Sequence, residues 1–154
     1  MTTKRYLPPS ALNSFLEGLP QAVSISTIGK SVKGLPISLL TIGNGKTKIL
    51  MWSQMHGNES TTTRALLDLI PWFLKLSQAQ LQKTFTLSII LQLNPDGAKA
   101  YTRLNANDVD LNRDAIDLTQ PESVALQDLY QEVNPDYCLN LHGQRTIFSA
   151  GKMG

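Results

Sequence analysis

Two histidines are the side chains of this 154-residue sequence best suited to metal chemistry, and each directly precedes a glycine where a predicted strand gives way to a loop. His56 and Glu59 are three positions apart, so their side chains can converge if Gly57 lets the backbone turn tightly. His142 follows a second predicted strand. Two imidazoles and one carboxylate are three ligands of a tetrahedral zinc site, whose open fourth position is typical of catalytic zinc.

The motifs that lie between these ligands follow a specific order. A His-x-x-Glu pair by itself is weak evidence, because a histidine near a glutamate is common in loops. Here the pair is followed by Asn-Pro-Asp-Gly at 94–97, by a segment at 103–113 that ends in Asp-x-Asn-Arg, and by Leu-His-Gly at 141–143. Together they resemble the zinc carboxypeptidase family, the metallocarboxypeptidases of carboxypeptidase A type, over about residues 52–143.

The resemblance implies a metal centre and one supporting carboxylate. His56, Glu59 and His142 would bind one Zn²⁺ ion per chain, and Asp110 would accept a hydrogen bond from the first histidine. Such a carboxylate fixes the tautomer of the imidazole and raises its basicity. The alternative for Asp110 is a solvated aspartate in a turn.

The resemblance also implies three substrate contacts. Asn112 and Arg113 would bind the terminal carboxylate of a peptide, since a guanidinium fork suits a planar anion. Arg103 would polarise the scissile carbonyl and stabilise the developing oxyanion. The substrate implied is a peptide or amide with a free C-terminal carboxylate. The alternatives are a helix cap followed by a surface cation for Asn112 and Arg113, and a surface arginine for Arg103.

Hydrolysis at such a zinc also needs a carboxylate that deprotonates the attacking water. The resemblance places this base downstream of the third ligand, but only twelve residues follow His142 and none is acidic. We therefore expect residues 1–154 to form a single partial catalytic domain, its N-terminal part, which hydrolyses peptides poorly alone. An incomplete sheet would leave a strand edge uncovered and favour self-association.

The elements expected to position these residues alternate between helices and apolar strands, which predicts an α/β fold with a mixed, mainly parallel central sheet flanked by helices. The resemblance implies three layers. Asn94–Gly97 is expected to be a turn, Pro71 to kink its helix or end it at residue 70, and Cys138 to be buried. The expected elements are a short helix capped by Ser10 and ended by Gly18, strands at 23–28 and 36–42, a hairpin from 36–42 through the turn 43–45 to 48–52, a helix over 65–74, a strand over 84–93, a helix from Pro121 and a central strand over 136–141.

Composition limits the classes of partner. The net charge is +2 and no basic block occurs, so we expect no nucleic-acid partner. No apolar run is long enough for a membrane span or a standard secretion signal, and the single cysteine is compatible with a reducing compartment. We therefore expect a cytoplasmic protein without a membrane partner. Trp52, Trp72, Phe73 and Phe85 are expected in the core.

The leading interpretation is a zinc-dependent carboxypeptidase that hydrolyses C-terminal amide bonds. One alternative is a related zinc amidohydrolase that acts on acylated amino acids or murein peptides, because related enzymes share the ligand motifs. Another is a catalytically silent module that binds zinc or carboxylates. A purely structural protein, in which both histidines are incidental, is the remaining alternative.

Overall fold

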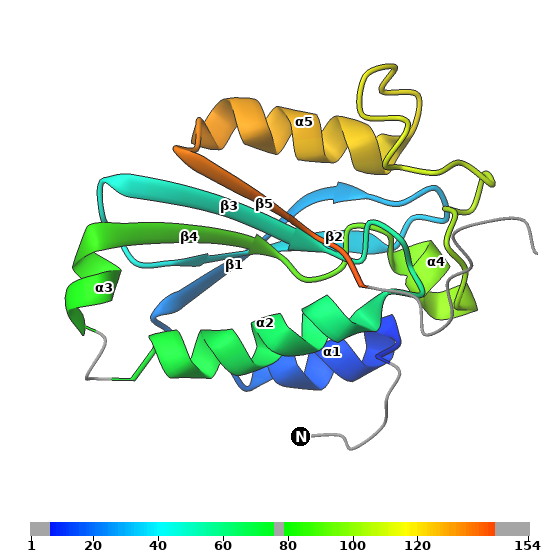
Figure 1. The fold of residues 1–154 in the computed structure, drawn as a ribbon. Helices are drawn as coiled ribbons and strands as arrows, with labels where there is room; N and C mark the ends of the chain where they lie inside the picture. Colours follow the sequence, from blue (N-terminus) through cyan, green and yellow to red (C-terminus); the bar gives the residue numbers. More distant parts are fainter. Residues whose placement is uncertain (1–6, 76–78, 144–154) are drawn as a thin grey trace, which may run out of the picture.

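The computed structural model describes residues 7–75 and 79–143, which form one mixed five-stranded sheet with helices on both faces (Figure 1). The predicted α/β class is confirmed, with three layers of helix, sheet and helix. In chain order the elements are α1 (Pro9–Glu17), β1 (Val23–Lys30), β2 (Pro36–Ile42), β3 (Thr47–Ser53), α2 (Ser60–Phe73), α3 (Ala79–Thr84), β4 (Phe85–Ile90), α4 (Pro95–Ala100), α5 (Pro121–Val133) and β5 (Tyr137–Leu141).

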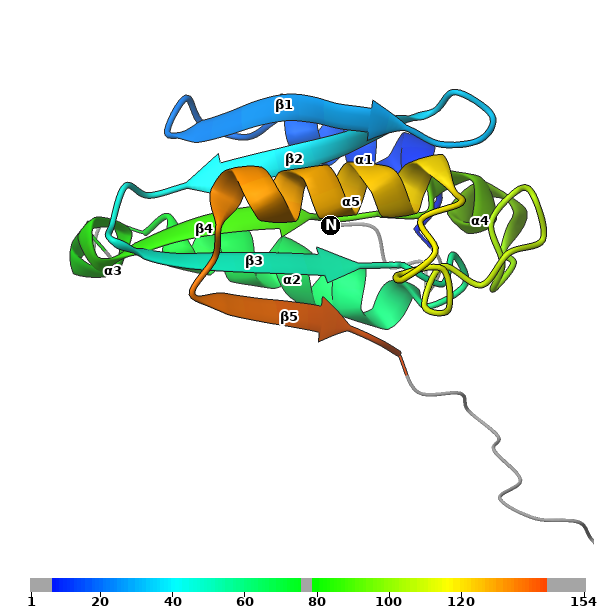
Figure 2. The same ribbon diagram turned by 90° about the horizontal axis from the view of Figure 1, so that it is seen from above.

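The strand order across the sheet is β1-β2-β4-β3-β5 (Figure 2). β1 pairs with β2 and β2 pairs with β4 in antiparallel fashion, whereas β3 pairs in parallel with both β4 and β5. The three parallel strands therefore end at the same edge of the sheet. This edge is where α/β folds place their ligands.

Two apolar clusters hold the layers together, one on each face of the sheet. Successive side chains of a strand point to opposite faces. Leu40 and Ile42 of β2 accordingly pack toward α1 and α2, and Ile37 and Leu39 of the same strand pack toward α5. Figure 1 shows α1 and α2 on one side of the sheet and α5 on the other.

The predicted hairpin between residues 36–42 and 48–52 is wrong, because β4 lies between β2 and β3. The connecting turn instead crosses the start of β4, where the Asn44 amide donates to the Gln82 carbonyl and the Gly45 amide to the Phe85 carbonyl. A Cβ atom on Gly45 would overlap the backbone of Thr84. The glycine thus permits a close crossing of two chain segments, and the hairpin of this sheet joins β1 to β2.

Three local expectations also differ from the structure. Helix α2 does not end at residue 70 but continues through Pro71 to Phe73, which is buried in the apolar cluster against the sheet. Asn94 does not simply form a turn: its side chain accepts a hydrogen bond from the Gly97 amide and caps the short helix α4. Helix α1 ends at Gly18 as predicted, but it begins at Pro9 without a side-chain cap.

Residues of β5 and α2 are more exposed than predicted. Among the described residues β5 is an edge strand rather than a central one, and Cys138 on it is exposed rather than buried. Trp72 is 45% exposed. Phe73 is buried as expected, whereas Trp52 and Phe85 are half-buried. No helix within 7–75 and 79–143 combines the length and apolar character that crossing a membrane requires.

Candidate metal centre

The parallel pairing of β3 and β5 brings the two histidines together. Ser53 at the end of β3 pairs with Leu141 at the end of β5. His142 directly follows Leu141, and His56 lies in the loop that follows Ser53. Their ring centroids are 4.8 Å apart although 86 positions separate them in the sequence.

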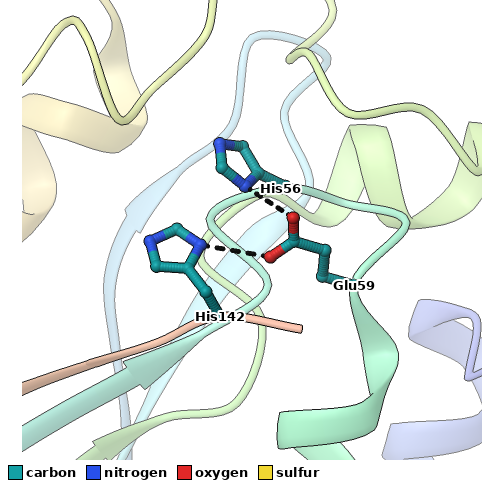
Figure 3. Close-up of side chains that lie close together, drawn as sticks. All are labelled: His56, Glu59 and His142. Carbon is teal, nitrogen blue, oxygen red and sulfur yellow. Dashed lines mark hydrogen bonds and ion pairs between the residues drawn. The ribbon is translucent and has the colours of Figure 1, made fainter. Parts of the chain in front are cut away.

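Glu59 lies between the two imidazoles and closes the cluster (Figure 3). Its Oε1 atom is 2.9 Å from Nδ1 of His56, and its Oε2 atom is 3.1 Å from Nδ1 of His142. One potential ligand atom from each residue lies within 4.8 Å of the other two. Glu59 is the residue before α2, and the positive end of a helix dipole favours a carboxylate there.

The spacing of these atoms suits a single small cation. Tetrahedral coordination at Zn–N distances of about 2.0–2.1 Å puts neighbouring ligand atoms roughly 3.3 Å apart. The separations of 2.9 Å and 3.1 Å around Glu59 are slightly shorter. The ligand atoms of the three residues lie within 4.8 Å of one another, so small side-chain movements would bring them to one ion. Two imidazoles with one carboxylate are a donor set that zinc prefers.

The hydrogen-bond partners of the two ring nitrogens of His56 also bear on whether the site can hold a metal ion. Its Nε2 atom lies 3.0 Å from Oδ1 of Asp110, while its Nδ1 atom faces Glu59. A neutral imidazole has one N–H group and can donate to only one of these carboxylates. If Nε2 of the neutral ring donates to Asp110, the lone pair of Nδ1 faces a carboxylate, and a proton or a metal ion between them would remove the repulsion. The buried ring, 2% exposed, thus fits a metal ligand.

Asp110 organises the loop beside the cluster. Its Oδ1 atom also accepts the backbone amide of Asn112 at 3.0 Å, and its Oδ2 atom accepts Nε and Nη2 of Arg103 at 3.2 Å and 3.1 Å. Burial by itself would raise the pKa of Asp110, but the hydrogen bonds from His56, Asn112 and Arg103 outweigh it and hold that pKa below its ordinary value. Asp110 therefore remains an ionised acceptor at neutral pH.

Arg103 bridges the two carboxylates of the site. Besides its contacts with Asp110, its Nη1 atom lies 3.4 Å from Oε1 of Glu59. With neutral histidines, Glu59, Asp110 and Arg103 carry a net charge of −1. A bound cation would reverse this excess of negative charge.

The predicted substrate-binding pair lies on the same loop. The carbonyl of Asp110 accepts the amide of Arg113 at 2.8 Å, which holds a turn over residues 110–114. The side chain of Asn112 is half-buried and that of Arg113 is exposed. The turn therefore places the backbone of both residues against Asp110, with the side chain of Arg113 exposed to solvent.

A buried polar network that the sequence did not reveal supports this loop. Asn105 accepts hydrogen bonds from the amides of Asn107 and Val109, and its Nδ2 atom donates to Gln120 and Glu122. The other oxygen of Glu122, which is 0% exposed, accepts the amide of Val32. A glutamate in the first turn of a helix is common, so the sequence carried no signal that Glu122 is buried.

The end of β5 is fixed to the start of α2. Oγ1 of Thr62 donates to the carbonyl of Leu141 at 3.2 Å, and the amide of Gly143 donates to Oε2 of Glu59 at 3.0 Å. Asn140, two residues before His142, contacts Sδ of Met55 at 3.7 Å. The position of His142 thus depends on backbone contacts with α2 and Glu59.

Comparisons with known proteins place these features in a family. A family model described as zinc carboxypeptidase matches residues 10–150. Carboxypeptidase SOL1 from Arabidopsis thaliana is 30% identical over an alignment that covers 86% of this chain and 31% of that protein. Gamma-D-glutamyl-L-diamino acid endopeptidase 1 from Lysinibacillus sphaericus is 26% identical, with 89% of this chain and 48% of that protein covered.

A solved structure gives the same result for the fold. The metallo-carboxypeptidase from Burkholderia cenocepacia matches with a TM-score of 0.82 at 26% identity, covering 90% of this chain and 42% of that one. The chain therefore spans between about a third and a half of the length of these three proteins.

Proposed function

Because the chain belongs to the zinc carboxypeptidase family, we propose that His56, Glu59 and His142 bind one zinc ion in a site for hydrolysis of C-terminal amide bonds. The arrangement of His56 carries this proposal. Its Nδ1 atom faces Glu59 while its Nε2 atom faces Asp110, which leaves a lone pair for a metal. Zinc bound there would act as a Lewis acid toward a carbonyl and toward water.

The loop at 103–113 would recognise the substrate. Arg113 would pair with the terminal carboxylate, and the Asn112 amide would add a neutral donor. Arg103, held by Asp110 through Nε and Nη2, directs Nη1 toward Glu59 and would stabilise negative charge developing on the scissile carbonyl oxygen. Asp110 supports all three residues: it accepts hydrogen bonds from the side chain of Arg103 and from the backbone amides of Asn112 and Arg113.

The general base is a separate requirement. Among the described residues, the carboxylates at the cluster are Glu59 and Asp110, and both are engaged by histidine and arginine. A carboxylate that ligates the metal or remains ionised through such contacts is poorly suited to shuttle a proton. We therefore expect the 154-residue chain to bind metal and a C-terminal carboxylate but to hydrolyse peptides slowly or not at all.

A second candidate function is hydrolysis of a different kind of amide, one that is not the C-terminal bond of an ordinary peptide. The related protein from Lysinibacillus sphaericus is named as an endopeptidase for γ-D-glutamyl-L-diamino acid bonds. Its similarity favours a zinc amidohydrolase that acts on acylated amino acids or murein peptides. A silent module that binds zinc or carboxylates fits the expected lack of turnover equally well.

Metal content per chain tests the proposal. The purified protein is dialysed against trace zinc, and zinc is measured by elemental analysis in wild type and in His142→Ala. We expect about one zinc per chain in wild type and its loss in the variant. Absence of zinc from folded wild type would contradict the proposed site.

Substrate recognition requires a separate measurement. Binding of a peptide with a free C-terminus is compared with that of the same peptide amidated at its C-terminus, with and without Arg113→Ala. We expect preference for the free carboxylate that the variant loses. Rapid zinc-dependent hydrolysis by the 154-residue chain would contradict the expected lack of a base, and equal binding of both peptides would contradict the role of Arg113.

A further inference from the structure

Gln54 has an unusual conformation just after β3, at the entry to the loop of residues 56–59, here called the ligand loop. It is 0% exposed, and its backbone φ of 47° lies in the left-handed region, which is uncommon for a residue other than glycine. Its carbonyl accepts the amide of Asn94 at 3.0 Å. Such strained positions persist only where the surroundings hold them in place, and they cluster at functional sites.

The carboxamide of Gln54 joins three separate parts of the chain. Its Oε1 atom accepts hydrogen bonds from Oγ1 of Thr63 in α2 at 2.7 Å and from Nε2 of Gln92, just after β4, at 2.8 Å. Its Nε2 atom donates to the carbonyl of Gly57 at 2.7 Å. All of these groups are buried. The side chain thus connects the framework of the fold to the loop between His56 and Glu59.

Gly57 is held on its other side as well. A Cβ atom on Gly57 would overlap the backbone of Gly97 and Ala98, so the loop lies directly against α4. The hydrogen bond from Gln54 fixes the carbonyl of this residue, which lies between the two ligands of the loop. Figure 3 shows how both His56 and Glu59 project from this short loop toward His142.

We propose that Gln54 is a positioning residue for the metal centre: its carboxamide sets the loop conformation that brings Nδ1 of His56 and the Glu59 carboxylate onto one ion. The proposal rests on the proposed function. Gln54 would control metal affinity without contacting the metal, as residues that orient ligands do. Because the Nε2 atom donates to the carbonyl of Gly57 in this loop, the effect of Gln54 on metal affinity can be measured separately from its effect on folding.

Gln92 provides a matched control within the same network. It is also buried, and its amide donates to Oε1 of Gln54 and to the carbonyl of Leu7, but within the described part of the chain it makes no hydrogen bond to residues 56–59. Gln54→Met and Gln92→Met each remove one buried carboxamide while preserving side-chain length. Both should destabilise the fold, but Gln92→Met keeps the hydrogen bond from Gln54 to Gly57 and should loosen the loop that carries His56 and Glu59 less than Gln54→Met does.

The test measures zinc affinity by competition with a chromophoric chelator, alongside urea unfolding of the metal-free proteins. We expect Gln54→Met to weaken zinc binding roughly 10- to 100-fold, and Gln92→Met, which leaves the hydrogen bond from Gln54 to Gly57 in place, to weaken it much less. The visible absorption of bound Co²⁺ provides a second readout, which should change more in the Gln54 variant. Equal affinity and equal spectra in wild type and folded Gln54→Met would overturn the proposal.

A second variant covers the case in which Gln54→Met does not fold. Gln54→Gly tolerates the left-handed backbone without strain and removes the carboxamide. If the side chain positions the loop, this variant also binds zinc weakly; wild-type affinity in folded Gln54→Gly would overturn the proposal. Failure of wild type itself to bind zinc would instead overturn the proposed metal centre, and this proposal with it.

Discussion

Nε2 of His56 lies 3.0 Å from Oδ1 of Asp110, although 54 positions separate the two residues. The same Asp110 oxygen accepts the amide of Asn112, so one atom joins the ligand loop to the loop proposed to bind substrate. This shared contact couples the orientation of the first ligand to the position of Asn112 and Arg113. Loss of the Asp110 charge should therefore affect metal and substrate binding together.

Asp110→Asn tests this coupling. The substitution preserves the shape of the side chain but removes the charge that orients His56 and pairs with Arg103. We expect zinc affinity to fall about 10- to 100-fold, as for other carboxylates that orient a ligand histidine. Chelator competition measures the change. Asp117→Asn, which removes a charge from an exposed residue of the neighbouring loop, serves as the control, and equal affinities in the two variants would contradict the coupling.

Gly57→Ala tests the packing of the ligand loop. The added methyl group would overlap the backbone of Gly97 and Ala98, so the loop must move away from α4. We expect a loss of about 1–3 kcal/mol in unfolding free energy, typical of overpacking, together with weaker zinc binding. Gly18→Ala is the control, since its methyl group would meet atoms no closer than 3.6 Å. Urea unfolding that gives the same stability for both variants would be inconsistent with this packing.

Asp114 should make stability depend on pH. Burial by itself would raise its pKa, but hydrogen bonds from Thr119 and from the Gln120 amide outweigh this and lower the pKa below the ordinary value. Because the folded-state pKa is depressed, the stabilisation is complete above the unfolded pKa of about 3.9 and is lost as pH falls through the folded value. Asp114→Asn should therefore cost about 1–3 kcal/mol at pH 6 and progressively less below pH 4, at the scale of hydrogen bonds to a charged group.

Urea unfolding of wild type and Asp114→Asn at a series of pH values measures this difference. Asp128→Asn, which removes a charge from the exposed face of α5, is the control for a change of net charge. A stability difference between wild type and Asp114→Asn that stays constant from pH 6 to pH 3.5 would show that the charge of Asp114 contributes nothing.

The edge of β5 should promote self-association of the 154-residue chain. Within the described residues β5 pairs only with β3, and Tyr137 and Leu139 on it are 62% and 45% exposed. The strand lacks the lysine or proline that commonly protects an edge. We expect the apparent mass in light scattering to rise with concentration under reducing conditions, and Leu139→Lys to suppress the rise.

Ile116→Lys provides the control for this prediction. Ile116 is 89% exposed in the loop before α5. Its replacement by lysine removes an exposed apolar side chain and adds a positive charge, as Leu139→Lys does, but away from β5. Suppression by Leu139→Lys alone would locate the association at β5. A monomer at all concentrations in wild type, or equal suppression by both variants, would contradict association through this edge.

Much of the fold could be predicted from local patterns. Apolar alternation and helical spacing indicated most strands and helices, and proline and glycine correctly marked the start of α5 and the end of α1. The capped helix after Asn94 was missed, and Pro71 does not end its helix, because local breakers are overridden when neighbouring residues gain buried contacts. The exposure of Cys138 and Trp72 was missed because apolar character does not reveal whether another layer covers a residue.

The metal-binding chemistry of this protein is evident from residue types alone: two histidines that each precede a glycine, a glutamate three positions after the first histidine, and an Asp-x-Asn-Arg motif between Glu59 and His142. Their convergence depends on the folded chain. Insertion of β4 between β2 and β3, and parallel pairing of β5 with β3, bring His142 to Glu59 across 83 positions. Strand order depends on contacts between residues distant in sequence, whereas local patterns report only which side chains alternate. The hydrogen-bond partners of Gln54 lie in three separate parts of the chain, so they could be identified only from the folded structure.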